Sequence, residues 1–263
     1  MRFLFVLLLV PLRVAGLLTL LIAGLVIAGL AYPWLAQPRR NRITRRWSAL
    51  LLAVCGARLR PVGALPPALA RDGMQPGEPG RLLLINHISW IDIFAVNAVL
   101  PSRFVAKAEI GRWPLLGTLV TLAGTLYIER GRRHAVHAVN HKVAEHLQLG
   151  ESVALFPEGT TTDGSELLPF HSNLIAPVME AGGQVWPVAL RYTEDGRPSR
   201  AAAFIGDDTL ARSIWNILTA RRLAIEVALL DPVAADGETH PTRHHVAQAA
   251  RERIAAYLGI GVG

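Results

Sequence analysis

The sequence predicts an α/β fold with a mixed central sheet of about seven strands flanked by helices, preceded by an apolar helical membrane anchor. Three observations support this prediction. The chain has 263 residues, of which 51% are hydrophobic and 18% charged, which is enough for a sizeable core and excludes a disordered or fibrous protein. A long apolar segment opens the chain. After it, short β-like runs alternate with amphipathic helical ones, as they do in α/β layer folds.

The N-terminal apolar segment has the length of a membrane anchor. Residues 14–35 include no charged residue, and as a helix rising about 1.5 Å per residue they would reach about 33 Å, enough to cross the hydrocarbon layer. Arginines follow at positions 39, 40, 42, 45 and 46, which favours the cytoplasmic side for the rest of the chain. A cleaved signal peptide and a buried core helix are the two alternatives.

A second apolar stretch, residues 47–57, is too short to span a bilayer. We expect it to form half of a helical hairpin that lies in one leaflet or covers the main domain. Residues 61–80 are rich in proline and glycine, which cannot continue a helix or a sheet. The sequence therefore divides into an anchor (1–60), a connector (61–80) and a main domain (81–263).

The main domain is predicted to alternate strands and helices. Apolar residues at helical spacing predict helices over residues 136–147, 210–218 and 246–257. Short apolar runs predict strands at residues 82–85, 103–106, 125–128, 152–156, 185–190, 201–205 and 223–230.

The first of these strands runs into a candidate catalytic pair. Residues 86–92 read NHISWID and lead into a helical pattern. In one continuous helix His87 and Asp92 would not meet, but with His87 in the turn and Asp92 in the first helical turn they can. Asp92 would then orient the imidazole while its other nitrogen takes a proton from a hydroxyl. The alternative is that Asp92, at capping-box spacing from Ser89, only caps the helix and that His87 is a turn residue.

A second candidate segment follows the predicted strand at 152–156. The strand stops at Pro157, and Glu158, Gly159 and Thr160 then offer a carboxylate, a flexible backbone and a hydroxyl. Open α/β sheets assemble their sites at the C-terminal ends of strands. The alternative is an ordinary β-turn, since proline and glycine occur in turns of every kind.

Four blocks in order resemble the glycerophospholipid acyltransferases, which include the 1-acylglycerol-3-phosphate acyltransferases. Asn86-His87 with Asp92 matches the family's NH-x4-D block, and residues 156–160 match its FPEGT block. GTLYIER at 124–130 resembles G-x-x-F-I-D-R, and WPVAL at 186–190 resembles V-P-V-A-L. The resemblance covers about residues 81–191, and four blocks at family-like spacing are far more specific than any one of them.

The resemblance implies roles for individual residues. His87 would be the base that activates a glycerol hydroxyl for attack on an acyl thioester, and Asp92 its orienting partner, with backbone N–H groups near the His87 turn as candidate oxyanion donors. Arg130 would bind the acceptor phosphate, unless it is a surface arginine, and Lys107 would lie near the headgroup, unless it is a solvated loop residue. The expected substrate-binding residues are Asn86, Ser89, Lys107, Arg130, Phe156, Pro157, Glu158, Gly159 and Thr160.

Two departures from the family pattern concern the acceptor. Glu129 stands for the usual aspartate, and Thr161 stands where many members have an arginine. The run FPEGTTTDG is closer to relatives with another acceptor headgroup, including lyso-ornithine lipid and lysophosphatidylcholine acyltransferases.

The resemblance implies an acyltransferase of the inner membrane of a bacterial-type cell, with its main domain on the cytoplasmic face. It would move an acyl group from acyl-CoA or acyl carrier protein, as co-substrate and without a further cofactor, to the sn-2 hydroxyl of 1-acylglycerol-3-phosphate, giving phosphatidic acid in phospholipid biosynthesis. The alternatives are acylation of lyso-ornithine lipid or another lysolipid, and a non-catalytic membrane protein that binds lipid. The expected partners are membrane lipid, the lysolipid acceptor and the thioester donor.

Other chemistries lack their usual signals. The single cysteine, Cys55, excludes an internal disulfide and is a poor start for a zinc or iron–sulfur site. His134, His137 and His141 share a predicted helix face, but no carboxylate or cysteine supports them, so we expect no metal. The chain has no G-x-S-x-G, H-E-x-x-H or Walker sequence. Its net charge of +7 does not by itself indicate nucleic-acid binding, because the arginines cluster beside the membrane segment.

Overall fold

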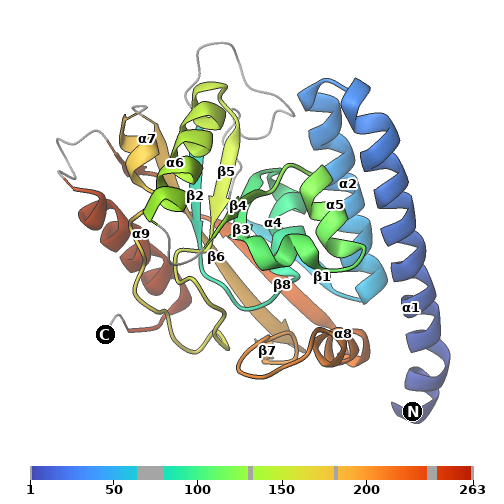
Figure 1. Cartoon of the computed structure of the whole chain (residues 1–263). Coiled ribbons are helices and arrows are strands. Elements are labelled where there is room, and N and C mark those ends of the chain that lie inside the picture. Colours follow the sequence, from blue (N-terminus) through green and yellow to red (C-terminus); the bar gives the residue numbers. More distant parts are fainter. Residues whose placement is uncertain (1, 64–79, 130–132, 181–182, 236–241, 262–263) are drawn as a thin grey trace.

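The computed structural model describes residues 2–63, 80–129, 133–180, 183–235 and 242–261. An N-terminal helical hairpin packs against a mixed sheet that has helices on both faces (Figure 1). The predicted α/β architecture, with a long apolar helix at the N-terminus, is therefore confirmed.

The sheet follows a path of seven strands in the order β1-β8-β6-β2-β5-β3-β4. The strands are β1 (Arg58–Val62), β2 (Arg81–Ile85), β3 (Arg103–Lys107), β4 (Leu126–Ile128), β5 (Ser152–Leu155), β6 (Gln184–Glu194) and β8 (Leu223–Leu229). Strand β2 is parallel to β5 and β6, whereas β8 is antiparallel to β6. The short strands β7 (Arg197–Pro198) and β9 (Val233–Ala234) pair with β6. Since β2, β5 and β3 are parallel, their C-terminal ends lie at one edge of the sheet.

Strand β2 forms the centre of two cores because every residue of its RLLLI sequence is buried. Leu83 and Ile85 face one core, called the first core below. Leu82 and Leu84 face the other, called the second core, as the two-residue period of a strand requires. Each such side chain contributes about 1.5–3 kcal/mol to the free energy of unfolding through its burial. A continuous apolar run is therefore the expected sequence for this strand.

The hairpin covers the first core. Its first helix, α1 (Arg2–Val26), continues through a π turn (Ile27–Ala31) and a 3₁₀ turn (Tyr32–Trp34), and its second, α2 (Gln37–Cys55), ends at Gly56 in the left-handed conformation. The Trp47 indole N–H donates to the carbonyl of Leu20 at 3.0 Å, and Gly24 allows the Trp47 ring to approach α1. Helix α2 packs on α4 (Asp92–Val99). Residues 47–57 thus belong to a hairpin that covers the domain, as expected.

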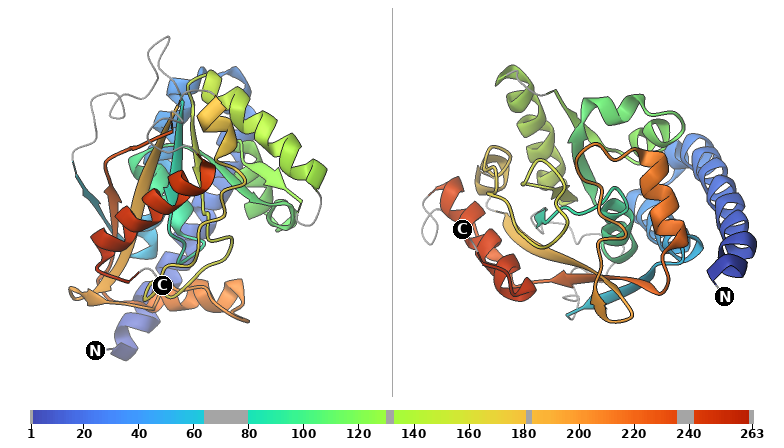
Figure 2. Two further views of the ribbon diagram at one scale, coloured as in Figure 1. Left: turned by 90° about the vertical axis from the view of Figure 1, so that its left-hand side faces the viewer. Right: turned by 90° about the horizontal axis from the view of Figure 1, so that it is seen from below.

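Helix α1 also packs on α5 (Leu116–Leu122) and α8 (Leu210–Thr219). Residues 8–34 have the length and hydropathy of a membrane span, and only a small share of that segment is buried. On the opposite face of the sheet lie α6 (Arg133–Gln148), α7 (Ala176–Glu180) and α9 (Arg243–Leu258), whose apolar residues form the second core (Figure 2). A 3₁₀ turn, η3 (Ala108–Arg112), connects β3 towards α5.

One predicted strand is wrong. Residues 201–205 form a turn and loop instead of a strand, because their backbone groups bond to other loops. The N–H of Phe204 donates to the carbonyl of Ile88 at 3.0 Å, and the Thr161 hydroxyl donates to the carbonyl of Phe204. The apolar composition of this segment reflects burial of Ala202 and Ala203 in the first core.

The seventh strand is β1, at the junction of the predicted anchor and connector. Its sequence, RLRPV, gave little strand signal because it contains a proline and alternating arginines. Strand β1 pairs only with β8 among the described strands, so it lies at an edge of the sheet. Proline is tolerated on an edge strand, where an N–H can be missing without breaking a ladder on both sides.

Candidate active site

The site begins where β2 ends, and Asn86 fixes the position of that end. Its side-chain amide donates to the carbonyl of Leu190 at 3.1 Å, and its side-chain oxygen accepts from the N–H of Leu190 at 2.7 Å. These bonds continue the pairing of β2 with β6 beyond the last ladder pair, Ile85 with Val188. Both polar ends of the amide are engaged, so Asn86 is placed to align the strand ends, and its contact with substrate stays a prediction.

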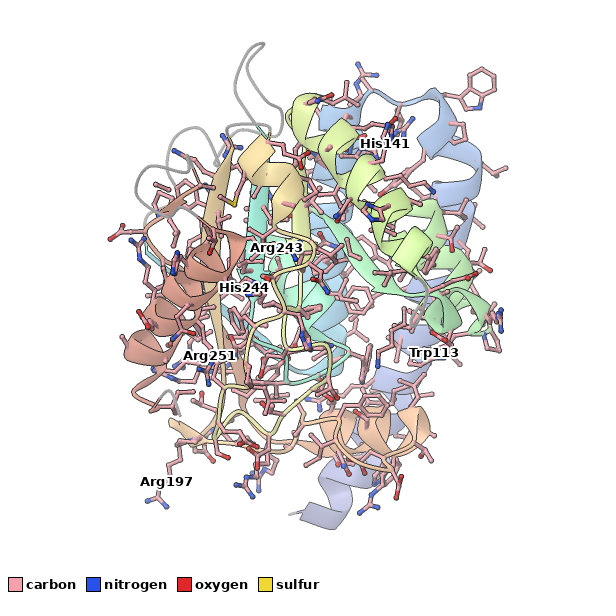
Figure 3. The ribbon with its side chains drawn as sticks, turned by 60° about the vertical axis from the view of Figure 1, so that its left-hand side comes forward. Trp113, His141, Arg197, Arg243, His244 and Arg251 are labelled. Carbon is pink, nitrogen blue, oxygen red and sulfur yellow. The ribbon has the colours of Figure 1, made fainter. Side chains whose placement is uncertain are left out.

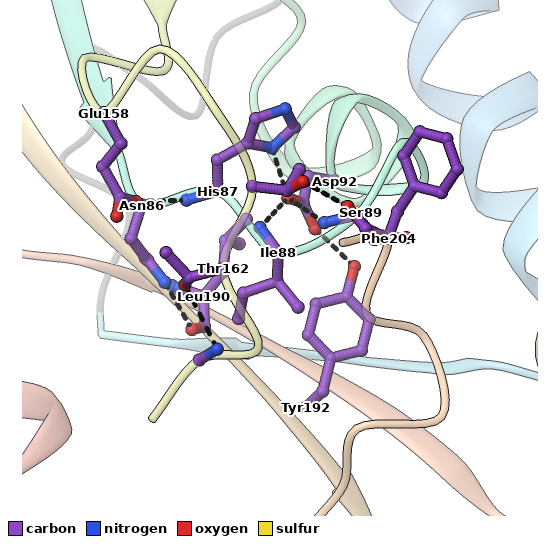
Figure 4. Close-up of polar contacts among 12 residues, drawn as sticks. Asn86, His87, Ile88, Ser89, Asp92, Glu158, Thr162, Leu190, Tyr192 and Phe204 are labelled. Atoms are coloured by element: carbon purple, nitrogen blue, oxygen red, sulfur yellow. Dashed lines mark hydrogen bonds and ion pairs between the residues drawn. The ribbon is translucent and has the colours of Figure 1, made fainter. Parts of the chain in front are cut away.

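His87 and Asp92 are brought together in the turn between β2 and α4. His87 Nδ1 lies 2.8 Å from Asp92 Oδ2, and the Asp92 side chain is fully buried (Figure 4). The same oxygen accepts the backbone N–H groups of Ile88 at 2.8 Å and Ser89 at 2.9 Å. Asp92 therefore makes one half of a capping box and also holds the imidazole, so the two interpretations of the sequence coexist. Within the described residues, the buried Ser89 hydroxyl has no partner.

Tyr192 completes the surroundings of Asp92, and the sequence did not indicate it. Its hydroxyl donates to Asp92 Oδ1 at 2.5 Å from strand β6 (Figure 4). Burial, together with the charge of Asp92, raises the pKa of Tyr192 well above its ordinary value of 10, so the hydroxyl stays a donor. A tyrosine in a buried strand, two residues after the WPVAL block, needs a hydrogen-bond partner, and that requirement is the signal that could have pointed to it.

Two contacts fix the orientation of the His87 imidazole: the Asp92 carboxylate at its Nδ1 atom and an aromatic ring against its face. The Phe156 ring stacks on it with 3.8 Å between centroids and 11° between planes, and Phe104 lies 5.6 Å beyond Phe156. The His87 side chain is 19% exposed, and its Nε2 points away from Asp92 (Figure 4). With Asp92 fixing Nδ1 as the donor, Nε2 is the nitrogen that can accept a proton from a hydroxyl.

Glu158 ties the FPEGT segment to the His87 turn. Its Oε1 accepts the N–H of His87 at 2.7 Å, and its Oε2 accepts the N–H of Leu168 at 3.0 Å. The N–H of Thr162 in turn donates to the carbonyl of His87 at 2.8 Å. Burial raises the pKa of Glu158 to about 7, against the lowering effect of the two backbone hydrogen bonds. This carboxyl therefore holds two loops together and changes its ionisation near neutral pH.

The loop behind Glu158 is held by α9. Arg251, which is buried, donates from its guanidinium to the carbonyl of Leu167 at 2.7 Å and to that of Leu168 at 3.0 Å (Figure 3). The carbonyl of Pro157 accepts the N–H of His171 at 2.9 Å. The FPEGT loop is thus fixed by a helix that lies beyond the four sequence blocks.

The ionisation of Glu158 should be visible in the pH dependence of stability. Its folded-state pKa lies above the ordinary 4.5, so its contribution to the free energy of unfolding is fully present below about pH 4.5 and is lost as the pH rises through about 7. At about 1.4 kcal/mol per pKa unit, this loss amounts to about 3 kcal/mol. Glu158→Gln should remove this part of the pH dependence, which urea unfolding in detergent micelles at several pH values measures.

Glu151→Gln is the control for Glu158→Gln, because the pKa of Glu151 is shifted in the opposite direction. Burial opposes ionisation of Glu151, but its ion pair with His146 and the hydrogen bonds from Arg103 outweigh burial and lower its pKa to about 2. The stability that Glu151 contributes is therefore present above about pH 4.5 and is lost as the pH falls through about 2. If the free energy of unfolding depends on pH in the same way in the wild type and in Glu158→Gln between pH 5 and 8, the raised pKa of Glu158 is wrong.

The backbone N–H groups of the His87 turn are already occupied. Those of His87, Ile88 and Ser89 donate to the carboxylates of Glu158 and Asp92. These three N–H groups are therefore engaged, because each carries one proton to donate, and oxyanion donors elsewhere near the turn stay a prediction.

The other predicted substrate-binding residues are spread around the site. Gly159 takes a positive φ of 70°, which suits glycine, and Thr160 is exposed. Lys107 is half-buried at the end of β3, at the same edge of the sheet as His87. Arg130 lies outside the described residues. Among the residues that the structure describes, no group of His, Cys, Asp and Glu side chains could hold a metal ion.

An apolar pocket adjoins the aromatic side of the site. It lies between the hairpin and the main domain, is lined mostly by apolar side chains, and is partly open to solvent. Hairpin residues Gly24, Ala28 and Trp47 form one wall, and Phe94 and Phe104 belong to the other. Phe104 is the link to His87, because it stacks on Phe156, which stacks on the imidazole.

Comparison with known proteins gives consistent matches. Residues 70–191 match the family model described as Acyltransferase. The chain is 41% identical over 200 residues to lyso-ornithine lipid O-acyltransferase of Pseudomonas aeruginosa, covering 76% of this chain and 73% of that protein. It is 37% identical over 192 residues to 1-acyl-sn-glycerol-3-phosphate acyltransferase of Neisseria gonorrhoeae, covering 71% and 74%. The crystal structure of the 1-acyl-sn-glycerophosphate acyltransferase PlsC from Thermotoga maritima shares the fold, with a TM-score of 0.68 at 15% identity over 98% and 97% of the two chains.

Proposed function

Because this chain belongs to the PlsC-type acyltransferase family, we propose that it is a lysolipid O-acyltransferase that uses His87 as its general base. The observation that supports this most directly is the contact of His87 with the buried Asp92, with an apolar pocket nearby. In this proposal the donor is an acyl thioester of coenzyme A or acyl carrier protein, and the acceptor is a membrane lysolipid.

The proposed reaction needs no covalent acyl-enzyme. His87 Nε2 accepts the proton of the acceptor hydroxyl as the hydroxyl oxygen attacks the thioester carbonyl carbon. A C–O bond forms, the carbonyl oxygen becomes an oxyanion, and its collapse breaks the C–S bond. The imidazolium returns the proton to the thiolate, which leaves as a free thiol. The negative charge of Asp92 stabilises the imidazolium between the two proton transfers.

For the acceptor we propose lyso-ornithine lipid in preference to lysophosphatidate, which the resemblance alone had put first. The relative from P. aeruginosa with the higher identity has that activity in its name. Thr161 stands where many family members have an arginine, and its hydroxyl donates to the carbonyl of Phe204. This position therefore supplies no cation for a phosphate headgroup. Lysophosphatidate is the second candidate, supported by the relative from N. gonorrhoeae and by Arg130.

The acceptor test compares lysolipids under identical conditions. Purified protein in detergent micelles is given one acyl thioester with lyso-ornithine lipid, lysophosphatidate or lysophosphatidylcholine, and the released free thiol and acylated lipid are measured. We expect the fastest turnover with lyso-ornithine lipid. Faster turnover with lysophosphatidate, together with rescue of a host that lacks its own lysophosphatidate acyltransferase, would favour the second candidate. Release of no thiol with any acceptor would support the non-catalytic alternative.

We propose that the apolar pocket holds the donor acyl chain and limits its length. Ala28→Phe places a large side chain in the pocket wall, and we expect it to shift the preference towards shorter acyl chains. Each methylene that loses its contact is worth about 0.8 kcal/mol, or roughly fourfold in relative kcat/KM. Competition between acyl thioesters of different length measures the shift. Ala53→Phe is the matched control, because Ala53 is exposed on α2 and does not line the pocket. Equal preferences in both variants would exclude the pocket as the acyl site.

We further propose that the hairpin attaches the enzyme to the cytoplasmic face of a bacterial-type inner membrane. Large apolar side chains on its outer surface are exposed, among them Leu12, Leu30 and Trp34. The arginines that begin α2 support the cytoplasmic side.

A further inference from the structure

Two segments from elsewhere in the chain contact the turn that carries His87. The first is the loop that follows the FPEGT block, where the N–H of Thr162 donates to the carbonyl of His87 at 2.8 Å. The second is the segment 199–206, where the N–H of Phe204 donates to the carbonyl of Ile88 at 3.0 Å. Figure 4 shows Thr162 and Phe204 beside this turn. Charged side chains on these two segments are therefore candidates for contact with the substrate on which His87 acts.

A pair of opposite charges joins the loop to the segment 199–206. Asp163 Oδ2 lies 2.8 Å from a guanidinium nitrogen of Arg200. Asp163 Oδ1 is held within the loop, where it accepts the N–H of Ser165 at 2.9 Å and also the Ser165 hydroxyl. These hydrogen bonds, together with the charge of Arg200, lower the pKa of Asp163 below its ordinary value of 3.8, so the group is a carboxylate at neutral pH. One carboxylate oxygen is thus fixed by the loop, and the other faces Arg200.

The two members of this pair differ in exposure. The Asp163 side chain is 17% exposed, whereas the Arg200 side chain is 72% exposed. An ion pair with such an exposed partner contributes little to stability, because water competes for the guanidinium. Arg200 can therefore turn away from Asp163 at small cost, and each charge can then bind a group of a ligand. A fixed carboxylate beside a guanidinium that can move suits a ligand with one positive and one negative group.

The position of the pair in the loop links it to the acceptor headgroup. Thr161 stands where many family members have an arginine, a residue suited to binding an acceptor phosphate. Asp163 follows two residues later, and both residues bond to the segment 199–206, Thr161 through the carbonyl of Phe204 and Asp163 through Arg200. The loop thus offers a neutral hydroxyl at position 161 and a carboxylate at position 163. A carboxylate there repels a phosphate and attracts an ammonium group.

We propose that Asp163 and Arg200 bind the acceptor headgroup and select a headgroup that carries both an ammonium group and a carboxylate. This inference rests on the proposed function and deepens it. When the α-amino group of ornithine is part of an amide bond, as in a lyso-ornithine lipid, the carboxylate and the δ-ammonium group remain charged. Asp163 Oδ2 accepts a hydrogen bond from the ammonium group, and Arg200 donates to the carboxylate. Lysophosphatidate has no cation for Asp163, so it binds less well.

The test combines a change in the protein with a change in the acceptor. The full chain in detergent micelles, as wild type and as Asp163→Asn, is given a saturating acyl thioester. The acceptors are lyso-ornithine lipid, the same lipid with its δ-amino group acetylated, and lysophosphatidate, and thiol release gives KM and kcat for each.

Asp195→Asn is the matched control. Asp195 forms an ion pair with Arg222 at 3.1 Å, and the two side chains are 61% and 75% exposed. Within the described residues, neither partner bonds to the His87 turn or to the FPEGT loop. The same loss of a carboxylate is therefore made at a surface pair that the proposal does not involve.

In the wild type, acetylation of the lipid should raise KM about tenfold, because a hydrogen bond between charged groups is lost. Asp163→Asn should show a similar rise with the unmodified lipid and no further rise with the acetylated one, since both changes remove the same contact. The value of kcat should change little, because His87 and Asp92 are untouched. For lysophosphatidate, KM in Asp163→Asn should stay the same or fall. Asp195→Asn should match the wild type with all three acceptors.

Two further variants separate the two charges of the pair. Arg200→Gln should raise KM for lyso-ornithine lipid and for its acetylated form by a similar factor, because both carry the carboxylate. Asp163→Glu keeps the negative charge and should stay sensitive to acetylation. A merely structural role for the loop would give losses that do not depend on whether the lipid carries its ammonium group.

The outcomes separate this inference from the proposed function. If acetylation leaves KM of the wild type unchanged, or raises it equally in the wild type and in Asp163→Asn, then Asp163 does not bind the ammonium group, and the inference is overturned while the proposed function stands. The first of these results needs no variant, so it does not depend on how Asp163→Asn folds. A wild type that acylates lysophosphatidate and not lyso-ornithine lipid would overturn the proposed acceptor together with the inference. Release of no thiol with any acceptor would overturn the enzymatic function itself.

Discussion

Replacement of His87 by alanine is expected to lower kcat/KM for lysolipid acylation by about 10²- to 10⁴-fold, because the acceptor hydroxyl loses its proton acceptor. This range corresponds to about 3–5 kcal/mol of transition-state stabilisation. The fold should tolerate the change, since among the described residues the imidazole forms a hydrogen bond only with Asp92, and it lies partly exposed. Thiol release measured with saturating acyl donor and varied lysolipid gives the loss.

His141→Ala is the matched control for this prediction. His141 lies on α6, its side chain is 76% exposed, and its ion pair with Glu145 connects two surface residues. The same loss of an imidazole at this position should leave kcat/KM unchanged. Full activity of purified His87→Ala protein would refute the proposed mechanism, whatever the acceptor.

Replacement of Asp92 by asparagine should give the second large loss, about 10²- to 10⁴-fold in kcat/KM, with the fold retained. An asparagine oxygen in place of Oδ2 can still accept from Ile88 and Ser89, and the amide group then faces the Tyr192 hydroxyl, which can act as an acceptor. The carboxylate charge that stabilises the imidazolium is lost. Activity and thermal unfolding of the same preparation separate the two effects.

Tyr192→Phe separates the charge of Asp92 from its hydrogen-bond network. This variant keeps the carboxylate and its three bonds through Oδ2 but removes the donor to Oδ1. An unpaired buried acceptor costs about 1–3 kcal/mol in the free energy of unfolding. We expect a smaller loss of kcat/KM than in Asp92→Asn. A larger loss of kcat/KM in Tyr192→Phe than in Asp92→Asn would mean that the position of the Asp92 side chain, more than its negative charge, determines its contribution to catalysis.

Most of the fold follows from patterns in the sequence, because apolar periodicity reports which side chains are buried. The strands at 82–85 and 185–190 and the helix containing Val139, Val143 and Leu147 lie where their patterns predict. The two errors concern segments where burial and hydrogen bonding diverge. Residues 201–205 include the buried Ala202 and Ala203, yet their backbone groups bond to loops, whereas β1 carries arginines and a proline because it lies at an edge.

Part of the candidate site was predictable for a different reason. His87 and Asp92 are close in sequence, so local chain geometry is enough to bring them together. Tyr192 contacts Asp92 from another strand, and Arg251 reaches the FPEGT loop from the C-terminal helix. Such contacts depend on the order of strands in the sheet, which a single sequence does not specify. The same holds for Glu158, whose bond to the N–H of His87 joins two loops from separate strands.

Because the hairpin forms one wall of the apolar pocket, the hairpin cannot be removed without changing the pocket. Gly24, Ala28 and Trp47 belong to the hairpin and yet line the cavity beside Phe104. Trimming the chain ahead of β1 to obtain a water-soluble fragment would leave that cavity open along one side and expose Leu119 and Val120 beneath it. We expect such a fragment to aggregate, and any that stays dispersed to accept thioesters with little regard to their length. Detergent or nanodisc preparations of the intact chain are therefore the proper material for measuring its selectivity.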